Sequence, residues 1–164
     1  MDENILAKIF EHNNWANQRI IDACSALSDE QLDIEPQSVT KGNIRETLIH
    51  LAASQRGYLA LLTTPLEARP TSPIPFAELE ESVRTSGEGL LALAKGSQTI
   101  LASRLRTRDG FLVEPWVVML QVINHATEHR EQIKSMLSYL GITPPDIDGW
   151  DYGEVTKALV PVSP

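Results

Sequence analysis

Apolar residues recur at spacings of three, four and seven along most of the chain, and this spacing is typical of amphipathic helices. The first run predicts a helix with apolar positions at Ile5, Ile9, Ala16, Ile20, Ala23 and Leu27. Ser28 and Gln31 then match a capping box, which predicts one short additional turn closed by Pro36. The N-terminal segment is therefore expected to be helical almost throughout.

Two more helical patterns follow. Asn43 and Glu46 form a capping pair before a helix that we predict from Ile44 to about Leu62. The stretch 65–75 contains four of the ten prolines and is predicted to be a connecting loop. A third helical pattern runs from Phe76 to about Arg106, with a bend or break expected at its three glycines. The sequence "RTRDGFLVEP" has Asp-Gly between apolar pieces and predicts a tight turn or a small hairpin.

The last helix is predicted from Pro115 to Leu140, because proline favours the first helical position and Gly141 can form a left-handed cap. Residues 142–164 are expected to form an extended tail that packs back through Trp150 and Tyr152. Four long helices joined by alternately short and longer links predict an all-α, up-down four-helix bundle.

Length and composition fit one globular domain spanning residues 1–164, with 42% hydrophobic and 22% charged residues. The net charge of −8 argues against general nucleic-acid binding, because phosphate backbones are held by clustered Lys and Arg. The one basic run, Arg104, Arg106 and Arg108, is interpreted as the solvated end of a helix.

The sequence also favours a cytoplasmic protein with no membrane partner. Cys24 is the only cysteine, so no internal disulfide can form, and we expect it to be a small core residue. The N-terminus lacks the apolar region of a signal peptide, and no stretch reaches the roughly 18 apolar residues of a membrane span.

Candidate chemistry comes from the histidines. His125 and His129 lie one turn apart on the apolar stripe of the last predicted helix, so both imidazoles are expected to point inward and to converge on one ion. His50 lies on an apolar stripe of the second predicted helix and would complete a set of three. Three neutral imidazoles leave one coordination position open, as in catalytic metal sites. Buried histidines that only make core hydrogen bonds are the alternative, and spacing alone leaves both interpretations open.

Three pieces of the chain resemble the DinB/YfiT-like superfamily in order and interval: "FEHNNWANQRIIDACSALSDEQL", "NIRETLIHLAASQRGYL" and "LQVINHATEHREQIKSMLSYLGITPPDID". The resemblance is strongest in "NHATEHREQI", which is similar to the histidine-histidine-arginine helix of that family. It implies a four-helix bundle, commonly a homodimer, with a divalent metal such as zinc or nickel held by His50, His125 and His129. The family is named for DNA-damage-inducible genes, but the name implies no contact with DNA.

The resemblance also bears on activity. Characterised branches of the superfamily include thiol-dependent S-transferases and a thiol-dependent isomerase, which implies a small-molecule substrate and a low-molecular-weight thiol as cosubstrate. Hydrolysis by a metal-bound hydroxide is a second chemistry that such a site allows. A non-catalytic metal-binding stress-response protein is the third interpretation. The catalytic residues themselves are not identified by the sequence.

Four further residues near these motifs have alternative roles. His12 is either a fourth ligand or base, or a partly exposed helix residue near Trp15. Glu128 has two possible roles. Its carboxylate faces either the solvent or a second copy of the chain, or it makes a hydrogen bond to a histidine. Arg130 and Gln132 flank the pair and are expected to orient a ligand carbonyl or to pair with an acid.

Overall fold

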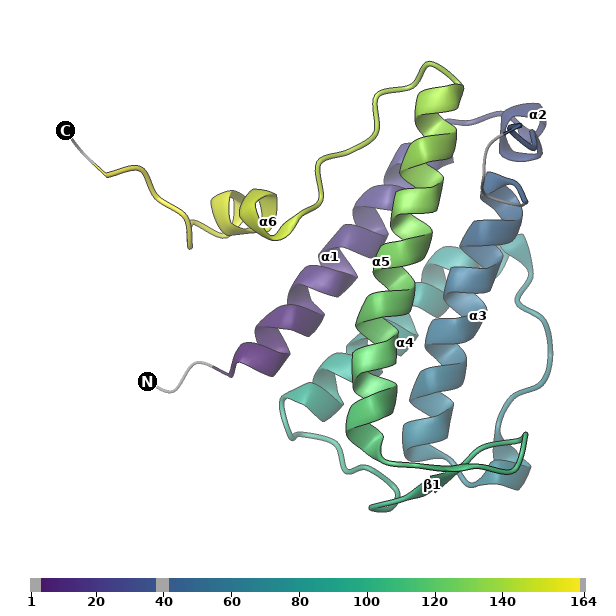
Figure 1. Ribbon diagram of the computed structural model, residues 1–164, viewed down its shortest axis with the longest axis vertical. Coiled ribbons are helices and arrows are strands. Elements are labelled where there is room, and N and C mark those ends of the chain that lie inside the picture. The colour runs from purple at the N-terminus through teal and green to yellow at the C-terminus, as the bar shows by residue number, and fades with distance from the viewer. Residues whose placement is uncertain (1–3, 38–41, 163–164) are drawn as a thin grey trace.

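The computed structural model describes residues 4–37 and 42–162, and four long helices account for most of them (Figure 1). These are α1 (Ile5–Ser25), α3 (Ile44–Thr63), α4 (Leu79–Ala94) and α5 (Pro115–Tyr139). The shorter elements are α2 (Asp29–Leu32), the 3₁₀ turns η1 (Leu66–Ala68) and η2 (Phe76–Glu78), the strands β1 (Leu105–Arg106) and β2 (Leu112–Val113), and α6 (Gly149–Val155). The predicted all-α bundle is confirmed.

The helices α2, α3 and α5 begin and end close to the predicted positions because their local capping signals are satisfied. Ser28 forms the predicted capping box at α2. The side chain of Asn43 accepts a hydrogen bond from the amide of Glu46 at the start of α3. Pro115 is the first residue of α5, and Gly141 has a φ of 75° just beyond its end. Within the described ranges, no helix is both long and apolar enough to cross a membrane.

The four helices form a closed ring of contacts in which α1 and α3 each touch both α4 and α5. Gln55 bonds to Ser86, and Leu59 lies against Gly89, so residue numbers rise in the same direction along α3 and α4. These two helices are therefore parallel, and the bundle departs in this respect from a strict alternation of directions (Figure 1). The link between them, residues 64–78, runs back along the bundle.

The third helix is shorter than the sequence indicated: it ends at Ala94 and not near Arg106. Gly96, with a φ of 73°, closes it in the left-handed conformation that non-glycine residues rarely adopt. Gly87 lies inside α4, where it provides room for a neighbour. A Cβ there would come within 2.6 Å of the Oδ1 of Asn14 on α1.

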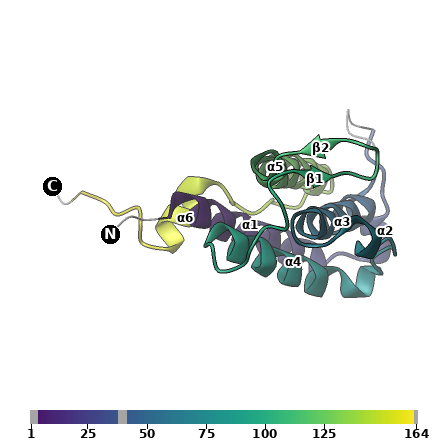
Figure 2. The same ribbon diagram turned by 90° about the horizontal axis from the view of Figure 1, so that it is seen from below.

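Residues 105–113 form the predicted hairpin, in which Leu105 pairs with Val113. Gly110 has a φ of 94° and follows Asp109 in the connecting turn. The basic run at 104–108 therefore belongs to a hairpin, and its interpretation as a helix end was wrong. The hairpin lies beside the ends of α3 and α5 (Figure 2).

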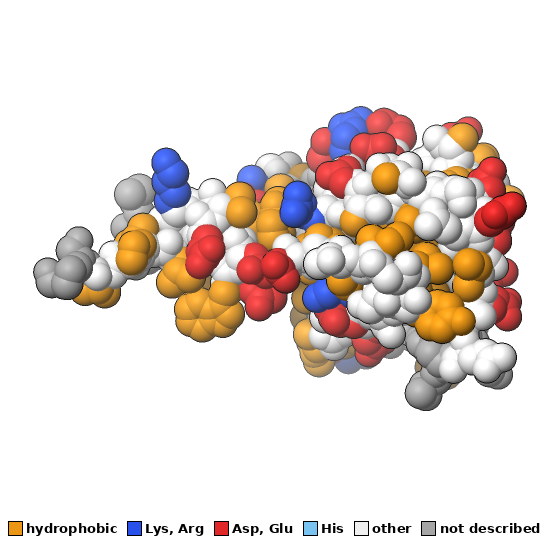
Figure 3. Space-filling view, turned by 90° about the horizontal axis from the view of Figure 1, so that it is seen from above, with side chains coloured by type: hydrophobic (Ala, Val, Ile, Leu, Met, Phe, Trp, Pro, Cys, Tyr) orange, Lys and Arg blue, Asp and Glu red, His pale blue; other side chains and the backbone are white. Residues whose placement is uncertain are grey.

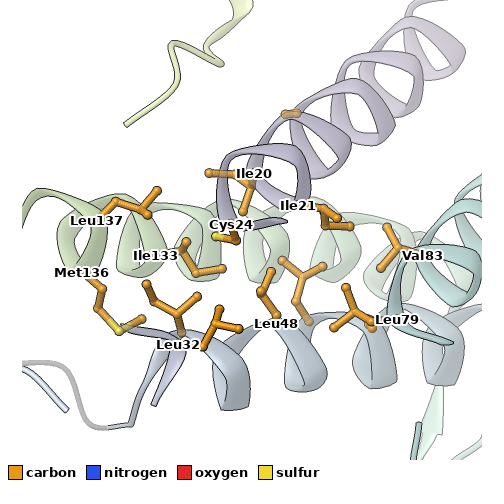
Figure 4. Packing of buried hydrophobic residues seen from close by; sticks show 14 of the residues in the cluster. Ile20, Ile21, Cys24, Leu32, Leu48, Leu79, Val83, Ile133, Met136 and Leu137 are labelled. Atoms are coloured by element: carbon orange, nitrogen blue, oxygen red, sulfur yellow. The ribbon is translucent and has the colours of Figure 1, made fainter. Parts of the chain in front are cut away.

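Two apolar clusters make up the core, and a layer of buried polar side chains separates them. One cluster surrounds Ile20 and Ile133, with side chains from α1, α2, α3, α4 and α5 directed toward one another (Figure 4). The other surrounds Phe10 and Leu90. The polar layer comprises Asn13, Asn17, Gln55, Ser86 and Arg130.

The buried face of α1 differs from the predicted stripe. Ile5 is 72% exposed and Ile9 40% exposed, although both were expected to be core positions. Ala16 and Ile20 of the stripe are buried as predicted, but Phe10, Asn13 and Asn17 are buried as well, so the buried face is rotated relative to the purely apolar pattern. The reason is that Asn13 and Asn17 occupy core positions, and a prediction based only on apolar residues does not include asparagine.

The C-terminal segment is not simply extended, because it contains the helix α6. Tyr152 packs against Trp15 of α1 as predicted, with ring centroids 5.3 Å apart. Trp150 does not pack back and is 71% exposed. After α6 the chain projects beyond the four long helices, and the segment carries exposed apolar side chains (Figures 2 and 3). Residues 163 and 164 of the predicted tail lie outside the described residues.

Candidate metal centre

The structure brings His50, His125 and His129 together from two helices. His50 comes from α3, and His125 and His129 lie one turn apart on α5. The Nε2 atom of His125 lies 3.1 Å from the Nε2 atoms of both His50 and His129. The candidate ligand atoms of all three lie within 4.8 Å of one another. The predicted set of three is therefore one cluster.

The spacing of these nitrogens fits a tetrahedral divalent ion. Zn–N bonds of 2.0–2.1 Å place two ligands of a tetrahedron roughly 3.3 Å apart. The two observed separations of 3.1 Å are close to that value. A neutral imidazole can donate from only one nitrogen, so three facing nitrogens cannot satisfy one another fully by hydrogen bonds alone. The donor set suits a borderline metal such as zinc or nickel.

The cluster lies at the surface of the seam between α3 and α5, and not inside the core as expected. His50 is exposed, and His125 and His129 are half-buried. The buried face of α5 instead contains Ala126, Arg130 and Ile133. The accessible position of the three histidines favours a functional site, because it leaves room for an additional ligand.

Burial favours the neutral form of His125 and His50. Partial burial lowers the pKa of His125 to about 4, and the nearby rings of His129 and His50 contribute further. The pKa of His50 is also lowered, mainly by burial and then by His129. Both rings therefore keep a lone pair at neutral pH, as metal ligation requires.

His129 is oriented by Gln132, one turn further along α5. Its Nδ1 lies 2.6 Å from the side-chain oxygen of Gln132, which can only accept a hydrogen bond. The ring proton is thus assigned to Nδ1, and Nε2 is left facing the other histidines. Glu128 is exposed and does not make this contact, so of the two interpretations of Glu128 the solvent-facing one holds.

A cavity of about 290 Å³ opens beside the histidines, lined by Gly42, Glu46, Thr47, His50, His129 and Gln132. Glu46 is a functional candidate that sequence reasoning treated only as a capping residue. Its position four residues before His50 places both side chains on one face of α3, and this spacing was the available signal. The cavity therefore combines imidazoles with one carboxylate.

Arg130 has a different role from either predicted one. It is 3% exposed, and its Nη1 donates to the Oδ1 atoms of Asn13 and Asn17 at 2.8 and 2.7 Å. Burial lowers its pKa to about 10. Asn17 donates in turn to Gln55, which donates to Ser86, so the layer connects all four long helices. This layer holds α5 against α1 with the histidine face directed to α3.

His12 and Cys24 do not belong to the cluster. The Nε2 of His12 donates to the carbonyl oxygen of Ile147 at 2.9 Å and so holds the C-terminal segment. Of the two roles considered for it, the helix residue near Trp15 is the observed one, with ring centroids 6.0 Å apart. Cys24 is a core residue as expected, and burial raises the pKa of its thiol to about 12.

A helical bundle with three histidines gathered at one interhelical seam defines a class of candidate metalloproteins, and the comparisons place the chain within a family. The model of the DinB family matches residues 1–160, so the chain belongs to the DinB family. It is 28% identical over 163 residues to Protein DinB of Bacillus subtilis (strain 168), covering 92% of this chain and 94% of that protein.

A solved structure supports the same fold. The chain is similar to a crystal structure from Exiguobacterium sibiricum 255-15 that is described as belonging to the DinB family. The TM-score is 0.64 at 18% identity, with 86% of this chain and 94% of that chain covered. The bundle expected from the sequence resemblance is therefore confirmed.

Proposed function

We propose that this protein is a metal-dependent enzyme that transfers a low-molecular-weight thiol to an electrophilic small molecule. The observation that carries the proposal is the cluster of three imidazole nitrogens beside an open cavity. Zinc or nickel is the expected ion. Such an ion with an open coordination position lowers the pKa of a bound thiol or water.

The residues around the cavity have distinct parts in this chemistry. His50, His125 and His129 would hold the ion, and Gln132 fixes the ring of His129. Glu46 takes the thiol proton, because it is the carboxylate that lines the same cavity. The sulfur forms a bond to the electrophilic carbon, and the bond to the leaving group breaks with its electron pair.

Metal analysis is the first test. Protein purified without chelator is expected to contain about one zinc or nickel ion per chain, measured by plasma mass spectrometry. His50→Ala and His125→Ala are expected to remove it while circular dichroism still reports the helical fold. His12→Ala is the matched control and keeps the metal. Protein that carries no ion before or after incubation with zinc and nickel would contradict the proposal.

Turnover is the second test. Bacillithiol, mycothiol, glutathione and cysteine are each offered with chlorodinitrobenzene, and thioether formation is followed by absorbance. Activity should require His50 and His125, and Glu46→Gln should lower it by about 10²–10⁴-fold without loss of metal. Hydrolysis of activated esters, with no thiol requirement, would favour the metal-dependent hydrolase. Stoichiometric metal without either activity would favour the non-catalytic stress-response protein.

We also infer that two copies of the chain pair as a homodimer. Exposed apolar side chains of α1 and α5, namely Leu6, Ile9, Trp116 and Leu120, lie around an apolar groove of about 430 Å³. Large exposed apolar surfaces usually mark interaction sites. Homodimers commonly place the same patch of both copies in contact.

A further inference from the structure

A second cavity, also of about 290 Å³, lies beside the part of α3 that follows His50, whereas Glu46 precedes His50. One wall is the face of α3 that contains Ser54, Gly57, Tyr58 and Leu61. The opposite wall contains two arginines, Arg69 after η1 and Arg108 in the hairpin turn. The cavity is therefore mainly apolar on the α3 side, is unfilled next to Gly57, and carries the positive charges of Arg69 and Arg108 at its edge.

This cavity adjoins the histidine cluster through Tyr58. The ring of Tyr58 meets the ring of His125 edge-on, with centroids 5.7 Å apart. Tyr58 also follows His50 by two turns on the same face of α3, a displacement of roughly 12 Å along the helix axis. A single elongated molecule can therefore contact both the histidines and the two arginines.

The two arginines are held together by backbone atoms. Arg108 donates through Nη2 to the carbonyl oxygen of Arg69 at 2.9 Å. Arg69 donates to the carbonyl oxygens of Thr64 and Arg106 at 2.9 and 2.6 Å. Among the described residues, no carboxylate forms an ion pair with either guanidinium, although the chain has a net charge of −8.

Two neighbouring positive charges without an anion are unfavourable. Burial lowers the pKa of Arg69, the charge of Arg108 lowers it further, and Glu67 acts weakly in the opposite direction. An anion between the guanidiniums would remove the repulsion and use their remaining N–H donors. Guanidinium groups match planar oxyanions because they offer two parallel donors.

We propose that Arg69 and Arg108 form an anion subsite that binds a carboxylate at the far end of the substrate or of the thiol. The subsite deepens the proposed transferase function and rests on it in one respect: the reacting end of the molecule lies at the histidines. Tyr58 separates the two ends and packs on the apolar middle of the ligand. The preferred ligand is a long molecule with a terminal carboxylate.

Two matched pairs of probes separate the subsite from the metal chemistry. Mercaptooctanoate and mercaptooctanol differ only in the terminal carboxylate, and octanoate and octanol repeat that comparison without the thiol. Binding of each to zinc-loaded protein is measured by isothermal titration calorimetry at low salt. In both pairs the acid is expected to bind about five- to tenfold more tightly than the alcohol, as for a partly exposed, charge-assisted contact.

Variants then locate the preference. Arg108→Gln and Arg69→Gln should each reduce the acid-to-alcohol ratio to about one, because a single guanidinium lacks the paired geometry. Arg104→Gln is the control: it removes the same charge from an exposed residue that does not line the cavity. Gly57→Leu should weaken all four probes equally. A Cβ at Gly57 meets no atom within 4 Å, so the new side chain has the cavity to fill.

The outcomes distinguish the two ideas. An acid preference that needs Arg108 in the octanoate pair, with no gain from the thiol, supports the subsite and contradicts the thiol-transferase function. Equal binding of acid and alcohol in both pairs overturns the subsite even if the thiols bind the metal-loaded protein. A preference that survives Arg108→Gln, or that Arg104→Gln removes equally, overturns it as well.

Discussion

At the residue scale, the hydrogen bond from His129 to Gln132 determines which ring nitrogen faces the other two histidines. Without that acceptor the ring can rotate or change tautomer. Gln132→Leu is therefore expected to weaken zinc binding by about 10–100-fold, the usual effect of removing a partner behind a ligand. Competition with a chromogenic chelator measures the affinity.

Glu128→Leu provides the control for this prediction. Glu128 lies on the same helix and is exposed. Its replacement should leave the zinc affinity unchanged. Equal affinities for the parent and Gln132→Leu would mean that packing alone, and not this hydrogen bond, orients His129.

The low pKa of His125 makes the stability of the metal-free protein depend on pH. Its folded-state pKa of about 4 lies below the ordinary value of 6.5, so the unfolded chain binds the proton more readily. The free energy of unfolding should thus fall as pH decreases from about 6.5 toward 4 and be fully restored above 6.5. Thermal unfolding across this window measures the change.

His125→Asn tests the origin of that dependence. The variant should lose less stability than the parent between about pH 6.5 and pH 5, where few carboxylates titrate. His12→Asn, at a histidine outside the cluster, is the control. If both variants follow the parent curve, His125 is not the titrating group.

The three histidines could be predicted because their spacing is local and the family resemblance supplied the partner helix. Their surroundings could not. The spacing of Glu46 and Tyr58 from His50 places them on one face of α3, but they line cavities because α3 meets α5 and the hairpin there, and no local pattern encodes that contact. Gln132 was a candidate from its position next to the histidines. Its hydrogen bond to His129 depends on the side-chain rotamer of His129, which the sequence does not reveal.

At the scale of elements, the position of α5 depends on the polar layer around Arg130. The apolar pattern placed His125 and His129 inward, whereas the helix turns Arg130 into the core. A buried arginine is rare, so a pattern based on hydrophobicity alone assigns it to the surface. The histidines then move to the edge of the buried face, where they remain accessible.

Replacing Arg130 tests this layer. Arg130→Met leaves the side-chain oxygens of Asn13 and Asn17 without their donor, and we expect a loss of about 2–4 kcal/mol in the free energy of unfolding. Urea denaturation of the metal-free protein measures it. Arg19→Met removes the same charge from an exposed position of α1 and should cost less than about 0.5 kcal/mol.

A neutral or stabilising effect of Arg130→Met would show that the layer can be replaced by apolar packing. In that case zinc affinity decides whether the layer still sets the register of α5. Unchanged affinity in a stable variant would contradict the positioning role of Arg130.

At the scale of the whole molecule, the all-α bundle followed from four strong helical patterns, but the relative direction of α3 and α4 did not. Helical periodicity has no directional information. The link 64–78 permits either a return along the bundle or a continuation at the same end. The contacts of Gln55 with Ser86 and of Leu59 with Gly89 show that the two helices are parallel.

Pairing of two copies is the remaining prediction at this scale. Leu120 is 52% exposed and Trp116 62% exposed on α5, next to the exposed Leu6 and Ile9 of α1. Covering these side chains removes their remaining apolar area from water in both copies, which favours pairing by roughly 25 cal/mol for each Å² covered. The proposed dimer thus depends on this surface.

Leu120→Glu would place a carboxylate in that surface on both copies, and an unpaired buried charge is strongly unfavourable. Light scattering at micromolar concentration should report a dimer for the parent and a monomer for Leu120→Glu. Leu112→Glu, at an exposed leucine of the hairpin that does not line the groove, should remain dimeric. A parent protein that is monomeric under these conditions, or a Leu120→Glu variant that is still dimeric, would exclude this surface as the dimer interface.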